Sequence, residues 1–132
     1  MSTESEVLLD AARAAGQKAY APYSKFLVGA ALQTEDGSIF TGANVENASL
    51  GLSLCAERVA ACTAVAAGHR QFKAIAVAGP AGVRSAPCGA CRQFLAEFSA
   101  GMRVTYSIAG ATLNTTLGEL IPDRFGADRS RT

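Results

Sequence analysis

Apolar residues recur at helical spacing in three stretches of the chain. Residues 5–20 carry apolar side chains three and four positions apart with charged residues between them, which predicts an amphipathic helix. Residues 52–68 are apolar nearly all round, which predicts a helix buried on every side, with Ser53 as its N-cap and Gly68 as its stop. Residues 88–101, which open on two cysteines, predict a third helix.

Between these helices, apolar and polar residues alternate or form short β-branched runs, which is typical of strands. Five strand segments are expected, at residues 26–34, 38–47, 73–79, 103–110 and 111–118. An Asp-Gly turn joins the first two into a hairpin. The order of elements predicts an α/β domain in which helices cover a mixed sheet, followed by one turn of helix and a tail broken by proline.

The composition narrows the class of protein. With 132 residues we expect one domain, and a formal charge of +1 provides no overall field to attract nucleic acid or an anionic membrane. Hydrophobic residues make up 49% of the chain and charged residues 17%, so we expect other subunits to cover part of the apolar surface. The N-terminus has no signal-peptide pattern and no stretch is apolar enough to span a bilayer, which favours a cytoplasmic protein.

The four cysteines lie in two short segments, "LCAERVAAC" at 54–62 and "APCGACRQ" at 86–93. In a reducing compartment such clusters favour a metal site or catalysis over disulfides. The spacing of Cys88 and Cys91 fits two ligands of one metal or a redox pair, but a redox pair leaves Cys55 without a purpose. If both cysteine-bearing helices meet at their N-termini, three sulfurs converge and the fourth position stays open, as in catalytic zinc sites.

Two further residues of metal-binding type are expected to stand apart from this cluster. Cys62 lies seven residues after Cys55, roughly 10 Å along a helix, so one metal does not readily reach both. We expect Cys62 to be a small buried apolar residue and His69 to be an exposed loop residue.

The residues that follow Cys55 carry charge beside the expected metal. Three thiolates on a dication leave a net negative charge, and Arg58, on the same helix face, is expected to donate to the sulfurs; the alternative is a surface ion pair. Glu57 does not share that face, but in the first turn its carboxylate can point beside the metal and transfer protons from water. The alternative for Glu57 is a simple interaction with the helix dipole.

The segments "APYSKFLVGAAL", "TGANVENAS", "CAERVA", "PCGACRQ" and "LIPDRFG" together resemble the zinc-dependent cytidine deaminases of the small free-nucleoside type. The resemblance covers most of the chain and implies a three-layer α/β/α cytidine deaminase-like fold with a mixed sheet of about five strands. It implies a single deaminase domain over residues 1–132, with a short tail from about residue 127. It also implies one zinc per subunit held by Cys55, Cys88 and Cys91, with Glu57 as the proton shuttle.

The same resemblance assigns the substrate contacts. Asn44 and Glu46 would hold the ribose hydroxyls, which suits their two-residue spacing on one face of an extended segment. Phe26 would pack on the pyrimidine, and the backbone N–H of Ala56 would meet its carbonyl. Phe125 matches a C-terminal phenylalanine that, in the homotetrameric members, enters a neighbouring subunit's site. Without the resemblance, Phe26 would be a core residue and "NVEN" a polar strand end.

The function that follows is hydrolytic deamination of cytidine and 2'-deoxycytidine to the uridines and ammonia, a step of pyrimidine salvage. An alternative is a blasticidin S-type nucleoside-antibiotic deaminase, against which the "NVENAS" segment argues. Deaminases acting on nucleic acids tend to carry histidine at the first ligand, which this chain lacks. The alternative outside enzymology is a structural zinc domain.

Overall fold

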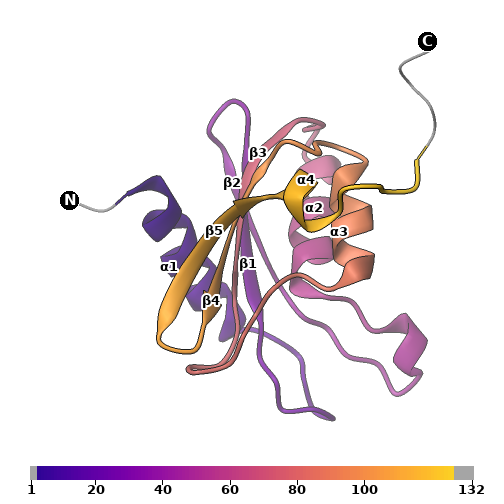
Figure 1. The fold of residues 1–132 in the computed structure, drawn as a ribbon. Coiled ribbons are helices and arrows are strands. Elements are labelled where there is room, and N and C mark those ends of the chain that lie inside the picture. The colour runs from indigo at the N-terminus through magenta and orange to yellow at the C-terminus, as the bar shows by residue number, and fades with distance from the viewer. Residues whose placement is uncertain (1–2, 127–132) are drawn as a thin grey trace.

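In the computed structural model, which describes residues 3–126, a five-stranded sheet separates one helix from two others (Figure 1). The elements in chain order are α1 (Glu4–Gly16), β1 (Gly29–Thr34), β2 (Ile39–Ala43), the 3-10 turn η1 (Leu50–Leu52), α2 (Ala56–Ala66), β3 (Phe72–Ala78), α3 (Gly89–Ala96), β4 (Arg103–Ile108), β5 (Ala111–Thr116) and α4 (Leu117–Leu120). The strand order is β2-β1-β3-β4-β5, with β3 and β4 parallel and the other neighbours antiparallel. The predicted three-layer fold with a mixed sheet is therefore confirmed, whereas the predicted tail from residue 127 lies outside the described residues.

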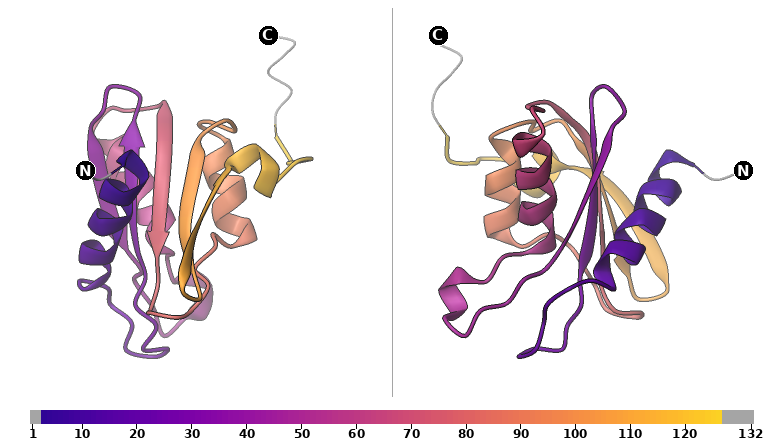
Figure 2. Two further views of the ribbon diagram at one scale, coloured as in Figure 1. Left: turned by 60° about the vertical axis from the view of Figure 1, so that its left-hand side comes forward. Right: turned by 180° about the vertical axis from the view of Figure 1, so that it is seen from behind.

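The two faces of the sheet bury different side chains because successive residues of a strand point to opposite sides. Ala30 and Leu32 of β1 pack in the larger core with α2 and α3, whereas Ala31 packs with α1. The apolar strand residues buried against α1 are all alanines, namely Ala31, Ala74, Ala76 and Ala78. Such a flat surface lets α1 lie close to the sheet, and Figure 2 shows this helix alone on that side.

The predicted hairpin is present, and hydrogen bonds to a side chain stabilise its turn. The Asp36 carboxylate accepts hydrogen bonds from the Thr34 hydroxyl at 2.5 Å and from the Ser38 N–H at 3.1 Å. These bonds, led by the one from Thr34, lower the pKa of Asp36 to about 2. Gly37 has φ of +92°, a conformation that favours glycine, so the Asp-Gly pair fits the turn chemically.

Helix boundaries differ from the expectation at three ends. The first helix ends at Gly16 rather than Tyr20, which instead forms a parallel bridge to Val45. The third helix ends at Ala96, before residue 101. The second helix begins at Ala56 with Cys55 as its N-cap, whereas Ser53 ends η1, so the expected Ser53 cap is wrong.

The helix α2 is not buried all round, and the burial expected for Cys62 is wrong. Ala60, Ala61 and Ala64 face the sheet and are fully buried, whereas Cys62 points to the opposite side and is exposed in the single chain. His69 is also not a free loop residue. It is half-buried, with its ring centroid 5.1 Å from that of Phe40 and its Nδ1 3.8 Å from the Asp36 carboxylate.

The parallel pair β3–β4 determines where the ends of the helices lie. The chain leaves the carboxyl end of β3, passes through the loop of residues 79–88 and returns through α3, so the N-terminus of α3 lies beside that of α2. Within residues 3–126, no helix is long and apolar enough to cross a membrane.

Gly42 fixes the distance between α2 and the sheet. A Cβ atom at this position would lie 2.4 Å from the Ala60 nitrogen and 2.6 Å from the Ala56 carbonyl oxygen, both backbone atoms that cannot turn away. Gly42→Ala should therefore destabilise the fold by about 2–3 kcal/mol, measured by denaturant unfolding. Gly101→Ala is the matched control because nothing lies within 4 Å of its Cβ. Equal stability of the two variants would contradict this close approach.

Candidate metal centre and active site

Two cysteines occupy the N-cap positions of adjacent helices. Cys55 caps α2 and Cys88 caps α3, both with extended backbone angles, and neither side chain makes a capping hydrogen bond to the backbone of its helix. Cys91 follows one turn into α3 and is fully buried. The thiols therefore project into the space between the two helix ends, where the helix dipoles favour negative charge.

The three sulfur atoms fit a single tetrahedral ion. All lie within 4.8 Å of one another, with Cys55 Sγ to Cys88 Sγ at 3.9 Å and Cys88 Sγ to Cys91 Sγ at 3.5 Å. Zinc–sulfur bonds of about 2.3 Å at tetrahedral angles place sulfurs about 3.8 Å apart. The cluster could thus hold one zinc ion, with three protein donors rather than the four of a structural site.

The thiols differ in acidity within the cluster. The hydrogen bond from Cys91, followed by that from Arg58, lowers the pKa of Cys55 to about 5. The pKa of Cys91 is raised, chiefly by its hydrogen bond to Cys55 and then by burial. Cys55 is therefore the more acidic of these two thiols.

Arg58 lies beside the sulfurs, as the sequence predicted. Its Nη2 donates to Cys55 Sγ at 3.4 Å, one helical turn away. Its Nε is buried without a hydrogen-bond partner, and none of the ion pairs among residues 3–126 includes Arg58, so the guanidinium bonds to the cluster and not to a surface carboxylate. This contact offsets part of the negative charge that three thiolates would collect.

The carboxyl group of Glu57 is buried next to the cluster. The residue is 4% exposed, and burial, assisted by the charge of Cys55, raises the pKa of its carboxyl group to about 7. Glutamate is rarely buried unless it has a specific function or partner. Its position in the first turn of α2 thus serves more than the helix dipole.

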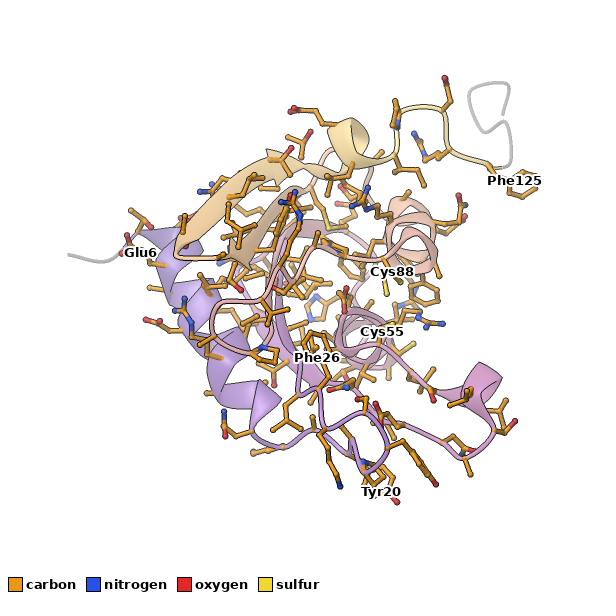
Figure 3. The ribbon with its side chains drawn as sticks, turned by 60° about the horizontal axis from the view of Figure 1, so that its bottom comes forward. Glu6, Tyr20, Phe26, Cys55, Cys88 and Phe125 are labelled. Atoms are coloured by element: carbon orange, nitrogen blue, oxygen red, sulfur yellow. The ribbon has the colours of Figure 1, made fainter. Side chains whose placement is uncertain are left out.

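A cavity of about 230 Å³ opens over these groups. It is lined by Phe26, Val28, Asn44, Cys55, Ala56, Glu57, Val77, Arg84, Ser85, Ala86 and Cys88. Figure 3 shows Phe26, Cys55 and Cys88 together at the centre of the molecule. A larger groove of about 610 Å³, between the end of α1 and the turn after β4, is lined by none of the cysteines and by no residue of the first cavity.

Asn44 and Glu46 point to the same side, as their spacing predicts, but both bind the segment before β1. The Asn44 amide accepts from the Val28 N–H at 2.9 Å and donates to the Phe26 carbonyl at 2.8 Å. The Glu46 carboxylate accepts from the Ser24 hydroxyl and from two backbone N–H groups, and these bonds, led by the one from Ser24, lower its pKa. Only Asn44 borders the cavity.

Phe125 does not enter the cavity of its own chain. Its side chain is 85% exposed, and in Figure 3 its ring lies at the edge of the molecule, away from Cys55 and Cys88. Its backbone carbonyl accepts a hydrogen bond from Gln93 Nε2 at 2.7 Å, which fixes the segment to α3.

Two residues that support the site were not identified from the sequence. The buried Ser85 hydroxyl bonds to the Ser107 hydroxyl at 2.7 Å and to the Val77 carbonyl at 3.2 Å, anchoring the loop before Cys88. Arg92 donates through Nε to the Pro87 carbonyl at 2.8 Å and thereby braces the backbone beside Cys88. No local pattern marks either residue, because their partners are distant in sequence or lie on the main chain.

Comparison with known proteins gives consistent matches over most of the chain. Residues 2–108 match the model of the cytidine and deoxycytidylate deaminase zinc-binding region. A cytidine deaminase of Sporosarcina psychrophila is 44% identical over 125 residues, which is 93% of this chain and 92% of that protein. A probable cytidine deaminase of Dictyostelium discoideum is 45% identical over 126 residues, covering 95% and 86% of the two chains.

Solved structures agree with these relatives. The crystal structure of a cytidine deaminase from Burkholderia pseudomallei has a TM-score of 0.86 and 50% identity, covering 94% of this chain and all of that one. The cytidine deaminase of Mycobacterium tuberculosis gives 0.83 and 38%, covering 96% of this chain and 100% of that one. With a matching family model, a matching fold and a cysteine cluster suited to zinc, the chain belongs to the cytidine and deoxycytidylate deaminase zinc-binding family.

Proposed function

We propose that this chain acts as a single cytidine deaminase domain, which hydrolyses cytidine and 2'-deoxycytidine to the uridines and ammonia. The observation that carries the proposal is the buried Glu57 beside three convergent thiols, at a cavity that Phe26 and Asn44 also line. A structural zinc site has no need of a buried carboxylic acid next to an incomplete donor set.

Cys55, Cys88 and Cys91 are the residues that would hold the zinc ion. Zinc supplies Lewis acidity there, which makes water a competent nucleophile near neutral pH. Arg58 holds the Cys55 sulfur and limits the negative charge that weakens this acidity. Ser85 and Arg92 keep the loop that carries Cys88 in place.

Glu57 moves the protons of the reaction. Its carboxylate accepts a proton from the attacking water, donates it to N3 of the pyrimidine and then assists the departure of ammonia from C4. The burial of Glu57 excludes bulk water from this transfer. Phe26 packs against the ring, and the N–H of Ala56, which lies at the start of α2, donates to the pyrimidine carbonyl.

The roles of Asn44 and Glu46 are proposed in a modified form. Both retain capacity for a ribose hydroxyl, but they also secure the segment that carries Phe26. Their loss would therefore displace the ring-packing residue as well as weaken sugar binding.

An ultraviolet assay of purified protein tests the proposed function. Cytidine, 2'-deoxycytidine, cytosine and blasticidin S serve as substrates, and zinc is measured in the same preparation. Turnover of the two nucleosides with about one zinc per chain supports the proposal. Turnover of blasticidin S alone, or zinc without turnover of any compound, contradicts it.

Arg58→Gln should lower kcat of the zinc-loaded protein by about tenfold and shift its pH profile, because the Cys55 sulfur loses a charged donor. Activity is measured across pH with zinc content determined for each sample. Arg58→Lys keeps the charge without the fork of donors, so its kcat should lie between those of the wild type and Arg58→Gln. An unchanged pH profile at full zinc occupancy would contradict the role of Arg58 as a donor to the Cys55 sulfur.

We also propose a cytoplasmic homotetramer with shared active sites. The support is a group of exposed apolar side chains, in which Leu50 is 77% and Leu52 67% exposed, together with the projecting ring of Phe125. Free thiols in the cluster also suit a reducing compartment.

Phe125→Ala should raise KM for cytidine by about tenfold without changing the size of the assembly, because the ring completes a neighbour's site. KM comes from the ultraviolet assay and size from sedimentation. Val7→Ala is the control, because Val7 is also an exposed apolar residue but lies on α1. A fully active monomer, or unchanged KM in Phe125→Ala, would contradict shared sites.

A further inference from the structure

The C-terminal segment, residues 117–126, lines no part of the cavity over the thiols. It is nevertheless packed on the body of the protein. Leu117 of α4 is fully buried, and Leu120 and Ile121 pack against the larger core. The helix α4 lies beside α3, the helix that carries two of the three cysteines of the cluster (Figure 1). A contact through α3 can therefore connect this segment to the metal centre.

Arg92 makes that contact, because it binds three backbone carbonyl groups from two parts of the chain. Its Nη1 donates to the Leu120 carbonyl at 2.9 Å, and its Nε donates to the Pro87 carbonyl at 2.8 Å. Its own backbone N–H donates to the Cys88 carbonyl at 3.0 Å. The guanidinium is planar and its donors have a fixed geometry, so the end of α4 and the peptide before Cys88 are held in a fixed relation to each other.

Both side-chain acceptors of Arg92 lie where the backbone needs an external donor. Leu120 is the last residue of α4, and the final carbonyl groups of a helix have no partner within it. Arginine commonly binds such carbonyls. Pro87 is fully buried and precedes the N-cap of α3, outside the hydrogen bonding of that helix. The loss of Arg92 would therefore release both backbone segments.

The position of the Cys88 sulfur depends on this backbone. Cys91 is buried inside α3, whereas Cys88 is exposed, stands at the N-cap and makes no capping bond. Side-chain packing therefore does little to hold the Cys88 thiol. Its sulfur lies 3.9 Å from that of Cys55 and 3.5 Å from that of Cys91. Because zinc–sulfur bonds are about 2.3 Å long, a small shift of the backbone at Cys88 takes one of the three sulfurs out of bonding range.

Building on the zinc site of the proposed function, we propose that Arg92 is a positioning residue that couples the packing of the C-terminal segment to the retention of zinc. When the segment is packed, Arg92 has both carbonyl partners and keeps Cys88 in bonding range. When the segment is displaced, the Leu120 carbonyl moves away and the guanidinium loses one of its two fixed partners. Zinc then leaves more readily, although the segment itself provides no ligand.

The first test measures the rate at which zinc leaves the protein. Excess 4-(2-pyridylazo)resorcinol, a coloured chelator, takes up the metal from zinc-loaded protein. Arg92→Gln should release zinc about tenfold faster than the wild type, and Arg92→Lys, which keeps the charge without the fork, should be intermediate. Arg70→Gln is the matched control, since Arg70 also donates to two backbone carbonyls, those of Val65 and His69, but at the far end of α2. It should release zinc at the wild-type rate.

Melting temperatures with and without zinc separate this role from a purely structural one. Zinc stabilises the native state in proportion to its affinity, so the gap between the two melting temperatures should narrow in Arg92→Gln. A residue that only supports the fold would lower both melting temperatures equally and leave the gap unchanged.

A double-mutant cycle tests the coupling itself. Ile121→Ala should loosen the C-terminal segment and speed zinc release a few-fold in the wild type, but should add nothing in the Arg92→Gln background. Leu113→Ala is its control, because Leu113 packs against the same core from β5 and should not change the release rate.

A release rate of Arg92→Gln equal to that of the wild type, or rate effects of Arg92→Gln and Ile121→Ala that simply multiply, would overturn the inference. If Arg92→Gln does not fold, Arg92→Lys and the comparison of Ile121→Ala with Leu113→Ala decide. A wild-type protein that binds no zinc refutes the proposed function. A zinc-containing, active wild type without the coupling refutes only this inference.

Discussion

Replacing Glu57 by Gln should leave zinc in place and lower kcat for cytidine by about 10³-fold. The amide has nearly the same volume as the carboxyl group, so the buried position beside Ala56 and Ala60 stays filled. What the variant loses is the ability to accept a proton from water and return it to the pyrimidine. Proton transfer by a positioned side chain typically contributes 10²- to 10⁴-fold.

The measurement is steady-state kinetics together with zinc content on the same sample. Glu35→Gln, at an exposed position in the turn between β1 and β2, makes the same chemical change away from the cavity and should keep full activity. A Glu57→Gln protein that retains kcat within a few-fold would show that another group moves the proton. Loss of zinc with normal activity per zinc would instead make Glu57 a supporting residue of the metal site.

The sequence predicted those features that depend on local chemistry. The Asp-Gly turn, the alternation in the strands and the positions of Cys55, Cys88 and Cys91 follow from short segments whose conformations are locally determined. Arg58 followed from its helical spacing to Cys55. The position of the Glu57 carboxylate beside the cluster was predicted from its place in the first turn of the helix, whereas its burial was not predicted.

Features that depend on distant partners were missed or wrong. Cys62 was expected to be buried because free cysteines usually are, yet only one side of α2 faces the sheet and Cys62 lies on the other. Ser53 has a side chain typical of an N-cap. However, Leu54 forms an antiparallel bridge to Val45, so the helix begins only after Cys55. Arg84 could not be identified as a cavity residue, because its position depends on Tyr106, which is 22 residues away.

Cys91→Ser should reduce bound zinc from about one ion per chain to near zero and abolish measurable deamination. Cys91 is fully buried between the other two sulfurs and Glu57, so no other described cysteine can replace it: the remaining one, Cys62, is exposed on the far side of α2. A hydroxyl is a poor ligand for zinc at neutral pH, where a bound thiol is deprotonated.

The melting temperature of Cys91→Ser should also fall by several degrees, because zinc that binds only the native state contributes to stability. Cys62→Ser is the matched control, since it removes one thiol from the same chain without touching the cluster, and it should keep zinc, activity and melting temperature. Zinc is measured by elemental analysis after dialysis against chelator-free buffer. If Cys91→Ser retained a full complement of zinc, two sulfurs would suffice to bind it, and the three-thiol centre on which the proposed chemistry depends would be wrong.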